Sequence, residues 1–222
     1  MNPETSDHID PFQAAHWDLV PGRTAVVGID PQNDFLHPDG WYAKSNVDIS
    51  HMRRGIEPTI KLLVAARAQD VPIIWTRHGF RNEHDAGAFF KLRPFLRDGG
   101  LRQGTWGYEL YEGLGAREDD WYVEKSRLSA FFNTNLETIL RGLNADTVLM
   151  AGVLTNQCVA ATSKDASFRD FKPIMVEDCI GTTLPHLHDP AMEMMQVGWA
   201  EVTTLEDTLE QLSRFRQLRS PG

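Results

Sequence analysis

Short apolar runs alternate with amphipathic stretches through most of this chain. The runs are rich in β-prone residues and bounded by polar or turn-forming ones, which is typical of buried strands in a parallel sheet. They lie at 24–30, 73–76, 121–125, 147–152, 173–178 and near 200–203. Helical periodicity separates them at 52–70, 133–142, 156–170 and 205–212. Strands that alternate with helices predict an α/β domain of three layers, α/β/α, with a doubly wound parallel sheet and right-handed crossovers.

Two segments lack a clean period. Residues 1–22 are polar, and we expect them to form an N-terminal arm that packs on the body or on a partner subunit. A single domain is then expected at 23–216. Residues 78–120 are rich in glycine and aromatic side chains. A segment of that length in a compact domain usually carries function or covers a site.

Composition narrows the possible partners. A formal net charge of −9 without a basic block disfavours nucleic-acid binding. No apolar run approaches the roughly 18 residues that span a bilayer, and the first residues lack the pattern of a signal peptide. We therefore expect a cytoplasmic protein that acts on a small molecule, with neither nucleic acid nor membrane as partner. The two cysteines, Cys158 and Cys179, argue against a disulfide framework and leave room for a catalytic thiol.

Three chemically useful residues share one predicted position in the fold. Asp30, Lys125 and Cys158 lie at or just past the carboxyl ends of strands, and these ends meet at one edge of a doubly wound sheet. Asp30 is a candidate general base, and Lys125 would lower the pKa of its neighbours. Cys158 lies near the N-terminus of a predicted helix, which favours the thiolate. Taken singly, each residue has a structural alternative: a turn cap before Pro31, a solvated lysine or an inert cysteine.

Cys179 is the competing nucleophile, because it also follows a predicted strand. It lacks the Gly-x-x-Thr turn that precedes Cys158, so we assign the chemistry to Cys158.

Three blocks of sequence, taken together, resemble a known family. Residues 28–35, 124–126 and 152–159 are similar, in order, to the signatures of the isochorismatase-like superfamily, over about residues 22–215. The resemblance implies a Rossmann-like fold, a catalytic triad and a non-proline cis peptide between Val153 and Leu154. It also implies an oxyanion hole made by the backbone N–H groups of Leu154 and Cys158, a homo-oligomer (dimer or tetramer) and no cofactor. The implied triad is Asp30, Lys125 and Cys158.

Within the superfamily, residues 73–75, 104–108 and 129–134 resemble ureidoacrylate and other carbamoyl-amide amidohydrolases. This implies hydrolysis of a C–N bond in a small amide or ureide through a thioester, with release of ammonia or an amine. Leu128 departs from the pattern, since the ureidoacrylate enzymes have a tyrosine there, and leaves the particular substrate open. The alternatives are enol-ether hydrolysis of the isochorismatase type, or a catalytically silent member that acts by binding or oligomerisation.

Other side chains are candidates for binding. The expected substrate contacts are Gln32, Phe35, Trp41, Trp106 and Phe131, although Gln32 and its neighbour Asn33 could equally hold the loop. Candidates for a substrate carboxylate are Arg93, Arg97 and Arg102. Nicotinamidases of the superfamily bind a metal through an Asp-x-His after the second strand, but Thr76–Phe80 lacks the acid. We therefore expect no metal: His78 and His84 would lie in a loop or contact substrate, and His186 and His188 would lie in a surface loop.

Overall fold

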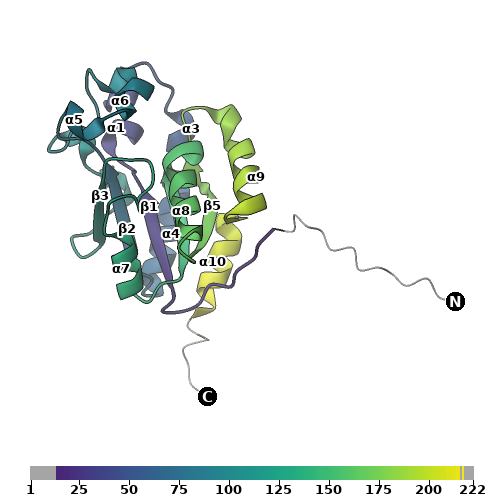
Figure 1. The fold of residues 1–222 in the computed structure, drawn as a ribbon. Helices are drawn as coiled ribbons and strands as arrows, with labels where there is room; N and C mark the ends of the chain where they lie inside the picture. Colours follow the sequence, from purple (N-terminus) through teal and green to yellow (C-terminus); the bar gives the residue numbers. More distant parts are fainter. Residues whose placement is uncertain (1–13, 216, 218–222) are drawn as a thin grey trace.

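The computed structural model describes residues 14–215 and residue 217. Its six strands form one sheet in the order β3-β2-β1-β4-β5-β6, and every neighbouring pair is parallel (Figure 1). Their bounds are β1 Thr24–Ile29, β2 Ile73–His78, β3 Trp121–Lys125, β4 Thr147–Val153, β5 Lys172–Gly181 and β6 Glu201–Thr203. This order confirms the predicted doubly wound sheet.

Helices cover both faces of the sheet, as expected for three layers (Figure 1). On one face, α4 (Ile56–Ala68) and α10 (Leu205–Ser213) contribute to one apolar core. On the other face, a second core includes side chains of α7 (Leu136–Gly142), α8 (Ala160–Ser167) and α9 (His188–Gly198). The strands supply both cores, because successive side chains point to opposite faces.

Short turns of helix fill the connections. Before β2 these are α1 (Asn33–Leu36), α2 (Trp41–Lys44) and α3 (Ser50–Arg53). The aperiodic segment after β2 contains α5 (Glu83–Ala86), α6 (Phe89–Leu92), η1 (Pro94–Leu96), η2 (Trp106–Tyr108) and η3 (Glu112–Leu114). After β4 comes the π-helical turn η4 (Thr155–Val159), and η5 (Pro185–Leu187) precedes α9. Residues 78–120, with their polar and aromatic composition, thus form short helical turns and no long helix.

Several predicted boundaries were wrong for local reasons. β2 continues to His78, because it still pairs with β3 there, where His78 lies opposite Lys125. The side chain of Gln32 also bonds both the N–H and the carbonyl of His78. The helix expected at 52–70 is divided into α3 and α4 near Gly55. A Cβ there would lie 3.1 Å from the backbone of Cys179, so β5 approaches the chain closely at this point. Helix α9 was not predicted.

The described part of the N-terminal arm packs on the body. The backbone N–H of Trp17 donates to Glu201 Oε2 at 2.6 Å, and Leu19 is buried. Residues 14–22 therefore follow the first of the two expected modes, whereas residues 1–13 lie outside the described residues. Among the helices that the structure describes, none has the length and apolar character needed to cross a membrane.

Candidate active site

Four adjacent strands bring polar side chains to one edge of the sheet. β3 ends at Lys125, β2 ends at His78, Asp30 follows β1, and Cys158 lies in η4 directly after β4. All four residues are buried. The three residues singled out from the sequence therefore meet at the predicted place, and His78 joins them.

Asp30 and Lys125 form a buried ion pair. Lys125 Nζ lies 2.6 Å from Asp30 Oδ2, and neither side chain is exposed. β2 lies between their strands, so the lysine spans about two strand spacings, on the order of 10 Å, which suits its long stem. The ammonium also donates to the carbonyls of Arg127 at 3.0 Å and Leu128 at 3.1 Å. The ammonium thus has two carbonyl acceptors besides its ion-pair partner, and a buried cation requires such partners.

The charge of this pair is favoured by its surroundings. Burial lowers the pKa of Lys125, but Asp30 and Cys158 outweigh it, and the net pKa is raised. Asp30 is fixed from the other side by Thr76, whose hydroxyl donates to Oδ1 at 2.5 Å and accepts from the Asp30 backbone N–H at 3.1 Å. Thr76 is therefore a positioning residue that sequence reasoning missed, since a threonine in a strand carries no signal of its own.

Close packing sets the position of the turn at residues 152–158, which leads from β4 to Cys158. Gly152 has φ +118°, and a Cβ there would collide with the backbone oxygen of Ile29 in β1. Only glycine fits this approach. The peptide bond between Val153 and Leu154 is cis, as the resemblance implied. Atoms of Asp30, His78 and Cys158 that could serve as ligands all lie within 4.8 Å of one another.

The protonation state of the Cys158 thiol differs from the prediction. Burial raises the pKa of Cys158 to about 12; the Asp30 carboxylate adds to this rise, and the Lys125 cation opposes it. The expected thiolate near neutral pH was therefore wrong, because desolvation outweighs the positive charge nearby. A thiol in this state needs a base during attack, and Asp30 is the adjacent carboxylate.

His78 is the residue whose place the sequence misjudged. It ends β2 and does not lie in a loop, and its Nδ1 is 3.9 Å from Cys158 Sγ. Its ring packs against Phe80 and Phe89, with centroids 5.1 and 5.3 Å away. Burial, followed by the charges of Lys125 and Arg127, lowers its pKa well below the ordinary value, so the imidazole is neutral.

The donor set of Asp30, His78 and Cys158 has the composition of a metal site. The ammonium of Lys125 already lies 2.6 Å from this carboxylate, and a metal cation would have to share the space with it. The arrangement therefore suits a proton-transfer site better than a cation site.

The expectation for the later histidine pair was half wrong. His186 is exposed, but His188 is buried at the start of α9. Arg54 Nη2 lies 2.8 Å from His188 Nε2, and Thr155 Oγ1 lies 2.9 Å from Nδ1. Burial, with Arg54 and His51 nearby, lowers the pKa of His188 to about 4. A neutral His188 thus supports the turn at residues 152–158 through Thr155.

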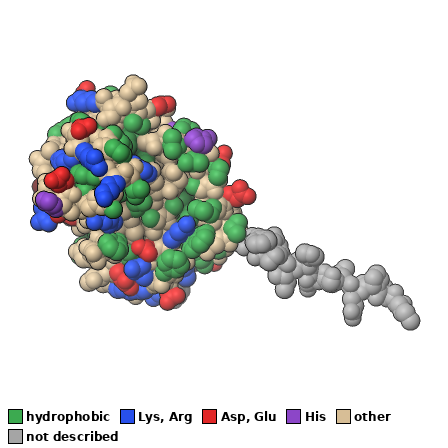
Figure 2. Space-filling view, turned by 45° about the horizontal axis from the view of Figure 1, so that its top comes forward, with side chains coloured by type: hydrophobic (Ala, Val, Ile, Leu, Met, Phe, Trp, Pro, Cys, Tyr) green, Lys and Arg blue, Asp and Glu red, His purple; other side chains and the backbone are tan. Residues whose placement is uncertain are grey.

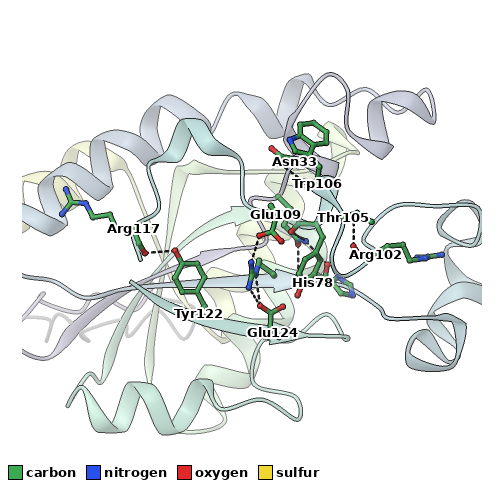
Figure 3. A network of polar contacts seen from close by, with 12 residues as sticks. Asn33, His78, Arg102, Thr105, Trp106, Glu109, Arg117, Tyr122 and Glu124 are labelled. Atoms are coloured by element: carbon green, nitrogen blue, oxygen red, sulfur yellow. Dashed lines mark hydrogen bonds and ion pairs between the residues drawn. The ribbon is translucent and has the colours of Figure 1, made fainter. Parts of the chain in front are cut away.

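The structure uses Gln32 to hold the loop. Its amide donates to the carbonyls of His78 at 3.0 Å and Tyr108 at 2.8 Å, and accepts from the His78 N–H at 2.8 Å. The neighbouring Asn33 donates to the carbonyl of Trp106 at 2.9 Å (Figure 3). Since both donor hydrogens of Gln32 are used, the structure favours the second of its two proposed roles over substrate contact.

An ion-pair network anchors the same segment beside β2 and β3. Arg77 bonds Glu109 at 2.6 Å and also pairs with Glu124, so both carboxylates converge on one guanidinium (Figure 3). The segment after β2 is thereby held next to the carboxyl edge of the sheet.

The aromatic residues predicted to contact substrate have different surroundings. Phe35 is buried against Tyr42 (centroids 4.6 Å apart), Trp41 donates its indole N–H to the Phe95 carbonyl, and Trp106 is 53% exposed. The Phe131 ring packs on Phe171, 5.7 Å away, which directly precedes β5 at the opposite edge of the sheet. These contacts give no support to the assignment of Phe131 to substrate binding, which stays a prediction.

Tyr42 lies within electrostatic range of both Cys158 and Arg93. Burial raises the pKa of Tyr42; Cys158 adds to this rise, and Arg93 opposes it. Tyr42 was missed, although it adjoins Trp41. Among the arginine candidates, Arg102 is occupied by the carbonyls of Gly100 and Leu96, and Arg97 is exposed.

The fold and the site define an α/β enzyme in which an acid, an amine and a thiol share one buried sheet edge. The family model for the isochorismatase domain matches residues 24–207. This chain belongs to the isochorismatase family.

Comparison with known proteins narrows the relationship. The chain is 33% identical over 174 residues to the ureidoacrylate amidohydrolase RutB of Agrobacterium fabrum, covering 72% of this chain and 76% of the relative. It is 28% identical over 214 residues to RutB of Methylobacterium radiotolerans, covering 88% and 83%. A crystal structure of a cysteine hydrolase from Pseudomonas syringae pv. phaseolicola matches with TM-score 0.83 and 28% identity, covering 91% and 98%. The chain is thus an amidohydrolase-type enzyme for C–N bonds, near the ureidoacrylate amidohydrolases, as predicted.

Proposed function

We propose that this enzyme hydrolyses a C–N bond of a small N-carbamoyl acid or related ureide through a covalent intermediate on Cys158. From an amide this intermediate is a thioester, and from a ureide it is the corresponding S-carbamoyl thioester. The observation that carries the proposal is the burial of Asp30, Lys125 and Cys158 together at one sheet edge. The relatives named as ureidoacrylate amidohydrolases support the substrate class, because ureidoacrylate is a ureide that carries a carboxylate.

The proposed acylation starts from the neutral thiol. Sγ attacks the substrate carbonyl carbon while its proton passes to the Asp30 carboxylate, and the carbonyl oxygen becomes an oxyanion. The N–H groups of Leu154 and Cys158 would donate to that oxygen, each contributing on the order of 3 kcal/mol to transition-state stability. The C–N bond then breaks as Asp30 returns the proton to the leaving nitrogen, which departs as ammonia or an amine.

Deacylation reverses these roles. Water attacks the thioester carbon and gives a proton to Asp30, and the C–S bond breaks as the sulfur takes that proton back. Lys125 stays protonated throughout, and its ammonium pairs with the Asp30 carboxylate at the start of each half-reaction. The enzyme returns to its initial protonation state.

The charge around the site favours an anionic substrate. Residues 77–102 carry six lysine and arginine side chains against three acids, although the whole chain has a net charge of −9. In Figure 2, Lys and Arg side chains gather on the side of the molecule where α5 and α6 lie in Figure 1. A local positive field attracts anions. Arg93 is our candidate for the substrate carboxylate, since its charge reaches Tyr42 beside Cys158.

The working unit in this proposal is the single domain at 23–216, because all the described strands join one sheet. A homo-oligomer remains a prediction.

A substrate panel tests the proposal. Ammonia release is measured with N-carbamoyl amino acids, ureidoacrylate, uncharged ureas and simple amides, using Cys158→Ala as the blank. We expect turnover of carboxylate-bearing ureides and little with their methyl esters. Equal rates on acids and esters would remove the anionic-substrate claim. Absence of ammonia from all compounds, with turnover of an enol ether such as isochorismate, would overturn the amide chemistry.

A further inference from the structure

We propose that His78 is a positioning residue for the nucleophile: its Nδ1–H donates to Cys158 Sγ and holds the sulfur beside Asp30. This inference rests on the proposed function only in taking Cys158 as the nucleophile. It adds a fourth polar group to the acid, amine and thiol considered so far.

The geometry places the imidazole on the reacting atom. Nδ1 lies 3.9 Å from Sγ, within reach of a hydrogen bond to sulfur, and His78 is only 1% exposed. The ring cannot easily turn away, because Phe80 and Phe89 pack against it. The backbone is held as well, since Gln32 bonds both the N–H and the carbonyl of His78.

The partners of the ring indicate the tautomer. Among the described residues, Nε2 is buried and has no hydrogen-bond partner. The Ser126 carbonyl acts on the ring and raises its pKa, but it makes no hydrogen bond to Nε2 and accepts from Arg127 at 2.7 Å. A buried N–H without an acceptor costs more than a bare lone pair, so the single proton of the neutral ring belongs on Nδ1. From Nδ1 it points to the sulfur.

A donor at this position has a definite effect on the reaction. As the proton of the thiol passes to Asp30, negative charge develops on Sγ in a buried environment. A hydrogen bond to a charged acceptor is stronger than one to a neutral acceptor, so the Nδ1–H favours the thiolate-like transition state over the resting thiol. His78 exchanges no proton itself and remains neutral.

The test compares two amides that place their N–H groups differently. In His78→Asn, the side-chain N–H lies near the position of Nδ1, whereas in His78→Gln it lies near Nε2. The readout is the rate of alkylation of Cys158 by iodoacetamide between pH 8 and 10, followed on the Cys158 peptide by mass spectrometry. This readout needs no substrate, so it is independent of the proposed substrate class.

We expect alkylation to slow by about tenfold at each pH in His78→Gln and His78→Leu, which corresponds to one unit in the thiol pKa. His78→Asn should stay within about threefold of the parent, and kcat should follow the same order with KM little changed. Phe89→Leu, which removes a ring contact of His78 but no polar group, is the packing control.

Equal behaviour of the Asn and Gln variants would overturn the proposal, as would a Gln rate within twofold of the parent. A similar loss in Phe89→Leu would assign the effect to packing. A change confined to KM would instead make His78 a substrate contact. If alkylation follows the expected order while no ureide is hydrolysed, the role of His78 stands and the proposed function fails.

Discussion

The two cysteines lie at the same edge of the sheet and differ in what faces them. Cys158 follows β4 and Cys179 lies near the end of the neighbouring β5. Both are buried, and burial raises the pKa of each to about 12. Around Cys158, however, stand the Asp30–Lys125 pair and His78, whereas Cys179 is influenced by the hydroxyl of Thr59 and by Asp178.

The comparison separates reactivity from burial. A buried thiol is inert unless other groups can receive its proton and hold its charge. At Cys158, strands β1, β2 and β3 supply those groups, and all three come from the first 125 residues of the chain. At Cys179 the corresponding space is taken by α3 and α4, so that the thiol belongs to the apolar core.

Replacing each cysteine by alanine should give the largest difference in activity between the two sites. Cys158→Ala should lower turnover by on the order of 10⁴-fold or more, because the covalent step is lost. Cys179→Ala should keep kcat within about threefold and cost about 1–2 kcal/mol of stability through a small cavity. Ammonia release and urea unfolding measure the two effects. Retained turnover in Cys158→Ala would remove it as the nucleophile.

Breaking the Asp30–Lys125 ion pair tests the charged pair that lies beside Cys158 and has no counterpart beside Cys179. Lys125→Met should cost roughly 3–5 kcal/mol of unfolding free energy, because a buried carboxylate loses its partner. Adding Asp30→Asn should restore much of the stability and none of the activity. Lys172→Met is the matched control: it breaks the exposed contact with Asp146, at 3.7 Å, and should cost under about 1 kcal/mol. Equal costs at both lysines would contradict a buried pair.

The cationic segment near Cys158 provides a third comparison. Arg93→Met should raise KM for a carboxylate-bearing ureide by about 10–100-fold, the loss expected for a hydrogen bond to a charged group. Its effect on the methyl ester should be small. Arg97→Met serves as control, since Arg97 is exposed in the same segment. Steady-state kinetics on the acid and the ester measure the difference, and an equal change for both would argue against carboxylate binding.

The raised pKa that the two cysteines share should give the smallest effect. The folded pKa of each is about 12 against an ordinary value of 9.0, so each contribution to stability is complete below about pH 9 and is lost as the pH rises toward 12. Between pH 9 and 10 the loss should approach about 1 kcal/mol per cysteine. Urea unfolding at both pH values should show a smaller loss in Cys179→Ala than in the parent. If Cys179→Ala loses as much unfolding free energy between the two pH values as the parent does, the pKa of Cys179 is not raised in the folded protein.

Apolar runs and short sequence signatures were enough to predict the sheet and the three central residues. The end of β2 was not predictable, because the apolar run stops at Thr76, whereas pairing with β3 and a bond from the side chain of Gln32 extend the strand to His78. The buried His188 was mistaken for surface because its sequence neighbours are polar, although Arg54 and Thr155 partner it from afar.

The remaining gaps in the prediction also depend on tertiary contacts. The state of the Cys158 thiol follows from how completely it is desolvated, which the helix position alone does not reveal. Phe131 was assigned to the substrate wall from composition, but the partner that determines its location, Phe171, is remote in sequence. The sequence around Phe131 gives no indication of the direction in which its ring points.

The reach of Lys125 across β2 ties function to the order of assembly. Its ammonium meets Asp30 only after the first three strands have paired, and the two residues are far apart along the chain. Contacts between distant residues form late, because the intervening loop must be closed first. A chain emerging from the ribosome therefore forms its secondary structure before the Asp30–Lys125 pair. Recovery of activity during refolding can thus report when β1, β2 and β3 have paired.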